Sequence, residues 1–124
     1  MAVVEIETEE AITGSGWCED GCSAISLIIE NHLSRLLIGQ DAGEIEGLWD
    51  RLFRATLPYG RKGVALHALS AIDLALWDLA GKAAGKPVYE LLGGPVKPDI
   101  PVYASALHPV GAAKIGRASC RERV

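Results

Sequence analysis

The segment from His67 to Gly94 constrains the fold of this chain more than any other. Apolar residues recur along it in steps of three and four, which predicts a long α-helix with one buried stripe. The stripe consists of Leu69, Ile72, Leu76, Leu79 and Ala83, and small residues on the adjoining face (Ala68, Ala71, Ala75 and Ala84) let another element approach the helix backbone. Gly85 and Pro87 end the helix, because glycine accepts a left-handed turn and proline cannot continue the ladder. We therefore expect a central helix, followed by one short helical turn over residues 88–92.

A β-hairpin is predicted before the helices. Within residues 2–8, Val4 and Ile6 alternate with Glu5 and Glu7, which is the period of a strand with one wet face. Residues 11–17 form the expected return strand, in which Gly14 and Gly16 permit close approach of another backbone. Because an isolated hairpin is not stable in water, a further strand is expected, and it would lie before Met1.

Two more helices are predicted between the hairpin and the central helix. The first runs from about Ser23 to Gly39, and its apolar stripe contains Ile25, Ile28, Ile29, Leu33, Leu36 and Leu37. Asp41 is predicted to cap the second, with Glu44 completing a capping box, and its core-facing residues are Ile45, Leu48, Trp49, Leu52 and Phe53. A short apolar strand is expected at residues 100–104. The predicted class is α+β, an antiparallel hairpin followed by a helical bundle.

Residues 114–124 differ from the rest of the chain and read as a translated sequencing adapter, so we expect them to be non-native. The whole chain has a formal net charge of −4 at pH 7. Because residues 114–124 hold four basic side chains and one acidic one, the rest carries −7. This acidic balance argues against a nucleic-acid surface.

Cys18 and Cys22 remain once that tail is set aside, and neither has a partner pair at zinc-site spacing, so no metal site and no disulfide framework is predicted. No run of about 20 apolar residues suggests a membrane span. The N-terminus is acidic where a signal peptide is basic. We therefore expect a cytoplasmic protein with no membrane partner.

The central segment resembles a known family signature. Ala68-Leu-Ser-Ala-Ile-Asp-Leu-Ala-Leu-Trp-Asp-Leu-Ala-Gly-Lys82, followed after four residues by Pro87-Val-Tyr-Glu-Leu-Leu-Gly93, is similar to the mandelate racemase/muconate lactonizing enzyme group of the enolase superfamily. The resemblance extends over residues 2–105, and residues 55–63 are most similar to acid-sugar dehydratases of the rhamnonate kind. The signature positions, expected to be structural, are Ala68, Asp73, Trp77, Asp78, Gly81, Lys82, Pro87, Leu91 and Gly93.

The resemblance implies a domain plan. Residues 1–94 would be an N-terminal capping domain without its first strand, the remnant of a three-stranded meander. Residues 95–113 would be a linker and first strand toward an absent TIM barrel, which needs on the order of 200 residues. In the family, the barrel binds Mg²⁺ and carries the base that removes the proton α to a carboxylate. No catalytic residue and no metal ligand is therefore predicted in this chain, and Mg²⁺ would belong to the full-length enzyme.

The leading functional hypothesis is a fragment of a Mg²⁺-dependent acid-sugar dehydratase, a lyase that works by α-proton abstraction. The alternatives are a racemase, epimerase or cycloisomerase of the same superfamily, and a non-catalytic helical binding module. The resemblance also implies three partners: the missing barrel, a small sugar-acid substrate and further copies in a homo-oligomer.

The candidates for contact with substrate lie between the sheet and the first helix, where relatives approach the active site. They are Trp17, Glu19, Asp20 and Gly21. Glu19 or Asp20 could touch a polyhydroxy substrate, and the alternative is a solvated acidic turn with Trp17 packed on the sheet. Asp73 and Asp78 are five residues apart and do not share a helix face, so they form no acid/base pair. Asp73 is instead expected to be a buried carboxylate satisfied by a neighbouring helix end.

Overall fold

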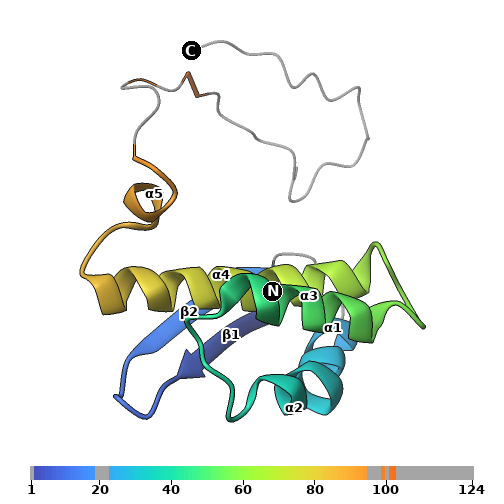
Figure 1. Ribbon diagram of the computed structural model, residues 1–124. Helices are drawn as coiled ribbons and strands as arrows, with labels where there is room; N and C mark the ends of the chain where they lie inside the picture. The colour runs from blue at the N-terminus through green and yellow to red at the C-terminus, as the bar shows by residue number, and fades with distance from the viewer. Residues whose placement is uncertain (1, 19–22, 95–98, 100, 103–124) are drawn as a thin grey trace, which may run out of the picture. The chain divides into compact units, whose positions relative to one another are not determined.

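A computed structural model describes residues 2–18, 23–94, 99 and 101–102. The chain divides into two compact units, residues 1–94 and 95–124, and the described helices and strands all lie in the first. In chain order they are β1 (Ala2–Glu7), β2 (Thr13–Cys18), α1 (Ser23–Ile28), η1 (Ile29–Leu33), α2 (Ser34–Leu37), α3 (Ile45–Thr56), α4 (Val64–Ala84) and α5 (Val88–Leu91) (Figure 1). The α+β class predicted from the sequence is confirmed.

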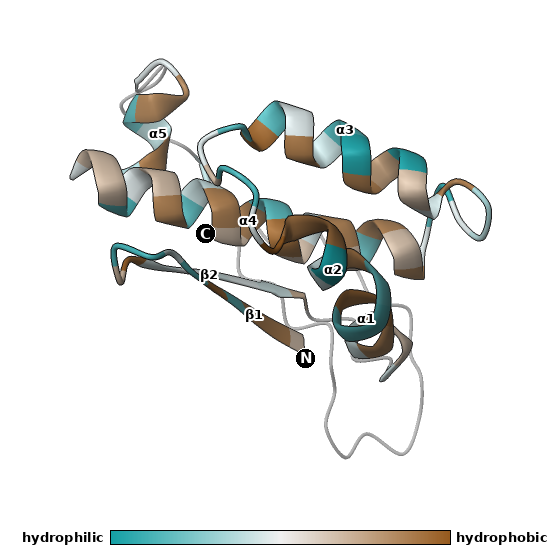
Figure 2. Cartoon of the chain, turned by 60° about the horizontal axis from the view of Figure 1, so that its bottom comes forward, coloured by the Kyte–Doolittle hydropathy of each residue, from teal (hydrophilic) through white to brown (hydrophobic). Residues whose placement is uncertain are grey.

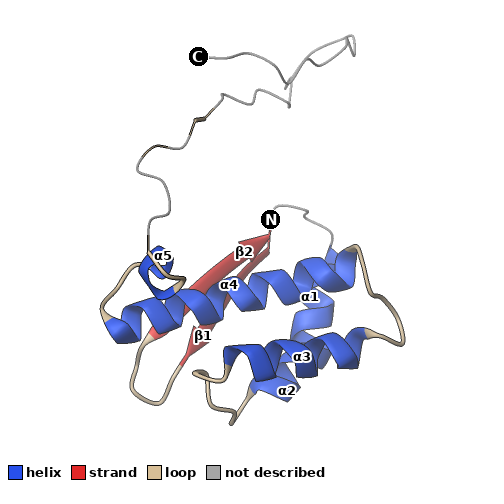
Figure 3. Cartoon of the chain, turned by 45° about the horizontal axis from the view of Figure 1, so that its top comes forward, coloured by secondary structure: helices blue, strands red, loops and turns tan. Residues whose placement is uncertain are grey.

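Helix α4 is the centre of this unit. The hairpin packs along one side of it, and α3 runs alongside it on another (Figure 3). Apart from Ala83 and Ala84, the predicted stripe and the small residues beside it are buried, and the buried residues of the helix are Ala65, Ala68, Leu69, Ala71, Ile72, Ala75, Leu76, Leu79 and Gly81. Ala83 and Ala84 are exposed, contrary to the sequence pattern, because they lie in the last turn, beyond most of the packing.

Length and hydropathy alone would allow α4 to cross a membrane. Half of its most apolar window is buried inside the domain, however, and its apolar side chains meet the hairpin and the other helices. In Figure 2 the hydrophobic stretches of α4 lie between the hairpin and α3. The packing is therefore that of the core helix of a folded domain.

The hairpin forms as predicted. Strands β1 and β2 pair antiparallel, from Ala2 opposite Cys18 to Glu7 opposite Thr13. Val4 is buried against the core, whereas Glu5 and Glu7 are exposed, which confirms the alternation read from the sequence. Within the described part of the chain the sheet has these two strands.

The first predicted helix is present but irregular. Helices α1 and α2 are joined by η1, a π-helical turn with helical backbone at both ends, so the three form one continuous helix from Ser23 to Leu37. A π turn adds a residue per turn and shifts every later side chain around the axis. Ile25 and Leu33 are fully buried, while the other members of the predicted stripe are only partly buried.

The predicted cap of α3 is wrong. The helix begins at Ile45, and its N-cap residue is Glu44, which makes no side-chain capping bond. The carboxylate of Asp41 instead accepts a hydrogen bond from the N–H of Gly43 at 2.8 Å, because aspartate readily closes a turn on its own backbone two residues on.

The side chains of α3 follow the predicted pattern with one exception. Ile45, Leu48 and Leu52 are buried as predicted. Trp49, which the sequence predicts to face the core, is 37% exposed and stacks on Phe53 with 5.1 Å between ring centroids. The indole therefore lies at the edge of the core.

Helix α4 ends as its sequence predicts. Gly85 is left-handed, with φ of 62°, and its N–H and that of Lys86 donate to the carbonyls of Lys82 and Gly81. This is the paired hydrogen-bond closure of a Schellman motif. Pro87 then precedes α5. The strand predicted at residues 100–104 falls largely outside the described residues.

Candidate functional site

Strand β2 lies directly on the backbone of α4. A Cβ atom built on Gly14 would come within 2.6 Å of the Cβ of Leu79, and one on Gly16 within 2.7 Å of the backbone nitrogen of Ala75. Both glycines are buried, and Ala71 and Ala75 opposite them are fully buried. The close approach predicted from the two glycines and from the small residues of the helix is confirmed.

Two signature residues fix β2 along the helix. Asp78 accepts a hydrogen bond from the backbone N–H of Ser15 at 2.8 Å and one from the ammonium of Lys82 at 2.7 Å. Lys82 also donates to the carbonyl of Thr13 at 2.8 Å. The Lys82 ammonium and the Ser15 N–H hold the pKa of Asp78 below its usual value. We call Asp78, Lys82 and the backbone of residues 13–15 the α4–β2 clamp.

The clamp positions the end of β2, where Trp17 lies. Gly16 faces α4, and successive residues of a strand point to opposite faces, so Trp17 points away from the helix. Its side chain is 54% exposed, opposite Val3 on β1, which is 59% exposed. The other substrate-capping candidates, Glu19, Asp20 and Gly21, lie outside the described residues, so the assignment of this loop stays a prediction.

The remaining signature residues lie along α4 and just after it. Ala68 is fully buried, Trp77 packs at the edge of the core, and Gly81 is buried beneath the backbone of Lys86. Pro87 is the N-cap residue of α5, Leu91 is partly buried at the end of that helix, and Gly93 has a φ of 107°. Each position is one where the backbone or the packing restricts the residue type.

Asp73 does not behave as expected. It is only partly buried, and no hydrogen bond or ion pair involves it within the part of the chain that the structure describes. Burial without a partner raises the pKa of this carboxyl. Asp78 bonds to β2 and Asp73 does not, so the two carboxylates form no acid/base pair.

The described residues contain no group of three or more His, Cys, Asp or Glu side chains that could hold a metal ion. The acidic and histidine side chains of the described residues therefore do not fit Mg²⁺, which requires several oxygen ligands around one point. No step of a metal-dependent reaction can be assigned to these residues.

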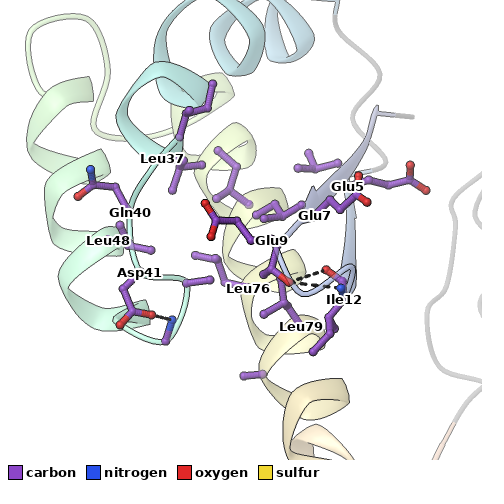
Figure 4. A pocket seen from close by; sticks show the side chains of 18 of the residues that line it. Glu5, Glu7, Glu9, Ile12, Leu37, Gln40, Asp41, Leu48, Leu76 and Leu79 are labelled. Carbon is purple, nitrogen blue, oxygen red and sulfur yellow. Dashed lines mark hydrogen bonds between the residues drawn. The ribbon is translucent and has the colours of Figure 1, made fainter.

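A groove beside β1 was not predicted from the sequence. It has a volume of about 820 Å³ and lies between β1, the connection at residues 37–43 and the C-terminal half of α4 (Figure 4). Five of the residues that line it are acidic and none is basic: Glu5, Glu7, Glu9, Glu10 and Asp41. The alternating glutamates along β1 were a sequence signal for its acidic side. They did not predict the groove, because residues of other segments form its remaining sides.

A hairpin clamped to one long helix and flanked by further helices defines the class of this chain as an α+β domain. Residues 1–93 match the family described as "Mandelate racemase / muconate lactonizing enzyme, N-terminal domain". The chain belongs to this family.

Its relatives include named dehydratases. A protein of Caldivirga maquilingensis that carries the provisional name L-rhamnonate dehydratase is 49% identical over 114 residues, which is 92% of this chain and 28% of the relative. The L-rhamnonate dehydratase of Saccharopolyspora erythraea is 46% identical over 114 residues, with 92% and 29% covered. The chain therefore spans less than a third of the length of these relatives.

Solved structures with the same fold belong to enzymes with different named activities. The rhamnonate dehydratase from Gibberella zeae complexed with Mg has a TM-score of 0.70 and 40% identity, over 77% of this chain and 23% of that one. The 3,6-anhydro-D-galactonate cycloisomerase from Zobellia galactanivorans has a TM-score of 0.76 and 37% identity, over 82% and 28%. A racemase from Streptomyces coelicolor with bound magnesium has a TM-score of 0.70 and 38% identity, over 75% and 27%.

Proposed function

We propose that this chain is the capping part of a Mg²⁺-dependent acid-sugar dehydratase that acts on a sugar acid of the rhamnonate type. The observation that carries the proposal is the 49% identity over 114 residues with the Caldivirga maquilingensis protein. In the proposed reaction the whole protein removes the proton α to the substrate carboxylate and expels the β-hydroxyl as water. Bound Mg²⁺ would supply positive charge to stabilise the developing negative charge.

The proposed part of this domain in that reaction is to cover the substrate. The clamp on α4 fixes β2, and β2 presents Trp17 at its end with more than half of the side chain exposed. We propose that Trp17 and residues 19–21 close one side of the substrate pocket and exclude water from it. The metal ligands and the base would lie in a further domain of the whole protein.

Racemase and cycloisomerase chemistry are the main alternatives. The cycloisomerase structure has a TM-score of 0.76 and the dehydratase one of 0.70, so likeness of fold does not favour dehydration. The higher sequence identity to the dehydratases is what ranks them first. A stand-alone binding module without catalysis is the alternative from another class. For the dehydratase, we also propose a cytoplasmic location and a homo-oligomeric state.

The test is an assay of the complete gene product with a panel of sugar acids that includes L-rhamnonate. We expect Mg²⁺-dependent formation of a 2-keto-3-deoxy acid, lost on treatment with EDTA and restored by Mg²⁺. Incorporation of solvent deuterium at the α carbon without loss of water would favour racemase chemistry instead. A complete protein that neither dehydrates any of the acids nor exchanges their α proton with solvent would support the binding module.

A further inference from the structure

One face of α4 is left open by the described elements. Strand β2 covers Ala71 and Ala75, and the hairpin and α3 flank the helix on two sides (Figure 2). Five other residues recur in steps of three and four, so they share a further face of the helix. Leu74 is 49% exposed and Trp77 is only partly buried. We call these five residues the outer face of α4: Leu66, Ser70, Asp73, Leu74 and Trp77.

Asp73 is the ionisable side chain of the outer face. It is partly buried, and no hydrogen bond or ion pair involves it among the described residues. Burial raises the pKa of its carboxyl, because the charged form is separated from water without a partner. Leu74 and Trp77 expose apolar surface next to it, where a solvated helix face would carry polar side chains. Apolar residues around one unpaired charge indicate a surface that a further polypeptide covers.

The relatives indicate which polypeptide that is. The matched family model describes an N-terminal domain, so the remainder of each relative follows it. The match covers 92% of this chain but only 28% and 29% of the two dehydratase relatives, so most of each relative lies outside it. A domain on the same polypeptide is tethered to α4 and therefore present at a high effective concentration. It is a better candidate than a separate protein.

We propose that the domain that follows in the whole protein packs on the outer face of α4, and that an arginine or lysine of that domain pairs with Asp73. Leu74 and Trp77 would supply apolar contact area at the centre of the interface. A basic side chain would supply the hydrogen bonds and the positive charge that the carboxylate lacks in this domain. The inference rests on the proposed further domain and not on the reaction which that domain catalyses.

A second copy of this chain is a poorer occupant of the outer face. Apart from Asp73, the five residues of the face are neutral, so it offers no basic side chain to a symmetry-related copy. A symmetric pair centred on this face would bring two Asp73 carboxylates together in an apolar interface. Like charges repel more strongly when water is excluded, so such a pair would be unfavourable.

The experiment uses the complete gene product with one introduced cysteine, either Leu74→Cys or Leu27→Cys. Leu27 lies on α1 and is 56% exposed, so it is a matched control for Leu74. Maleimide labelling of each site is followed by peptide mass spectrometry, and each rate is divided by that of the same variant unfolded in urea. We expect Leu74→Cys to react at least about tenfold more slowly than Leu27→Cys.

Two results of the labelling experiment would overturn the proposal. Equal normalised rates at the two cysteines would show that nothing covers the outer face in the complete protein. Protection of Leu74→Cys that disappears on dilution, as subunits separate, would assign the face to a second copy instead. Because the readout does not involve substrate, neither result depends on whether the protein is a dehydratase.

A charge reversal tests the partner of Asp73. Asp73→Lys, added to Leu74→Cys, is expected to raise the normalised labelling rate about tenfold, because two like charges would then meet in the interface. Glu30→Lys makes the same change in net charge at an exposed position of η1 and should leave the rate unchanged. Equal effects of the two reversals, or none from Asp73→Lys, would contradict pairing with a basic side chain.

Discussion

At the scale of single residues, the contact between β2 and α4 depends on what is missing as much as on what is present. Gly14 and Gly16 leave no side chain between the two backbones, and Asp78 and Lys82 bond to the backbone of the strand from the side. The glycines could be interpreted from the sequence because only glycine permits such an approach. The bond between Ser15 and Asp78 could not be predicted, because residues 63 positions apart meet only in the folded chain.

The first prediction concerns Gly16. Gly16→Ala should lower the free energy of unfolding by about 2 kcal/mol or more, because the new methyl group would overlap the backbone of α4. Ser15→Ala is the matched control, since Ser15 lies next to Gly16 but its side chain is exposed. Urea denaturation measures both variants. Equal stability of the two would show that β2 does not lie against the helix backbone.

The second prediction concerns pH. Burial raises the pKa of Asp73 in the folded state, so the folded protein binds this proton more tightly than the unfolded one. The charged carboxylate therefore lowers stability as pH rises through and above the ordinary aspartate pKa. Asp73→Asn should raise the melting temperature near pH 7 and have little effect near pH 3. Glu30→Gln, at an exposed position, serves as control. A stabilisation by Asp73→Asn that is the same at both pH values would contradict this explanation.

The third prediction tests Trp17 in the complete gene product. Trp17→Ala should raise KM for the sugar acid by roughly tenfold, if the indole closes the substrate pocket as proposed. Val3→Ala, opposite it on β1 and similarly exposed, should lower stability by a comparable amount and leave KM unchanged. Similar kinetics for the two variants would assign Trp17 a purely structural role.

At the scale of elements, the sequence predicts what depends on local chemistry and periodicity. The hairpin, the long helix and its glycine end are such features, and all three are confirmed. The π turn at residues 29–33 was not predicted, because one extra residue in a helix does not change a short apolar pattern noticeably. The predicted cap at Asp41 was wrong because the same side chain also stabilises a turn, and the local sequence does not decide between the two.

The fourth prediction concerns the α4–β2 clamp. Asp78 and Lys82 are partly exposed, so solvent weakens their interaction, and a double-mutant cycle with Asp78→Asn and Lys82→Met should give a coupling of about 0.5–1 kcal/mol near pH 7. The folded state lowers the pKa of Asp78, so this stabilisation is present above the ordinary aspartate pKa. It is lost as pH falls through the lower, folded value. A cycle on the exposed pair Asp50 and Arg54 within α3 serves as control, since its partners lie on one element. No coupling at Asp78 at any pH would contradict the clamp.

At the scale of the whole molecule, the signature in α4 was sufficient to predict the family, because its residues are held by packing and backbone contacts inside one domain. The groove beside β1 could not be predicted, since β1, residues 37–43 and α4 form it together only after folding. The proposed chemistry belongs to a further domain. The proposed contribution of this domain is the end of a hairpin that the α4–β2 clamp holds on α4.

The most direct measurement is the sequence of the gene beyond the codon for Ala113. We predict that native codons replace those for residues 114–124, and that the reading frame continues through eight strand–helix repeats with three spaced acidic residues at strand ends as Mg²⁺ ligands. A stop codon there, or a continuation without such repeats, would contradict the claim that this domain covers the active site of a Mg²⁺-dependent enzyme.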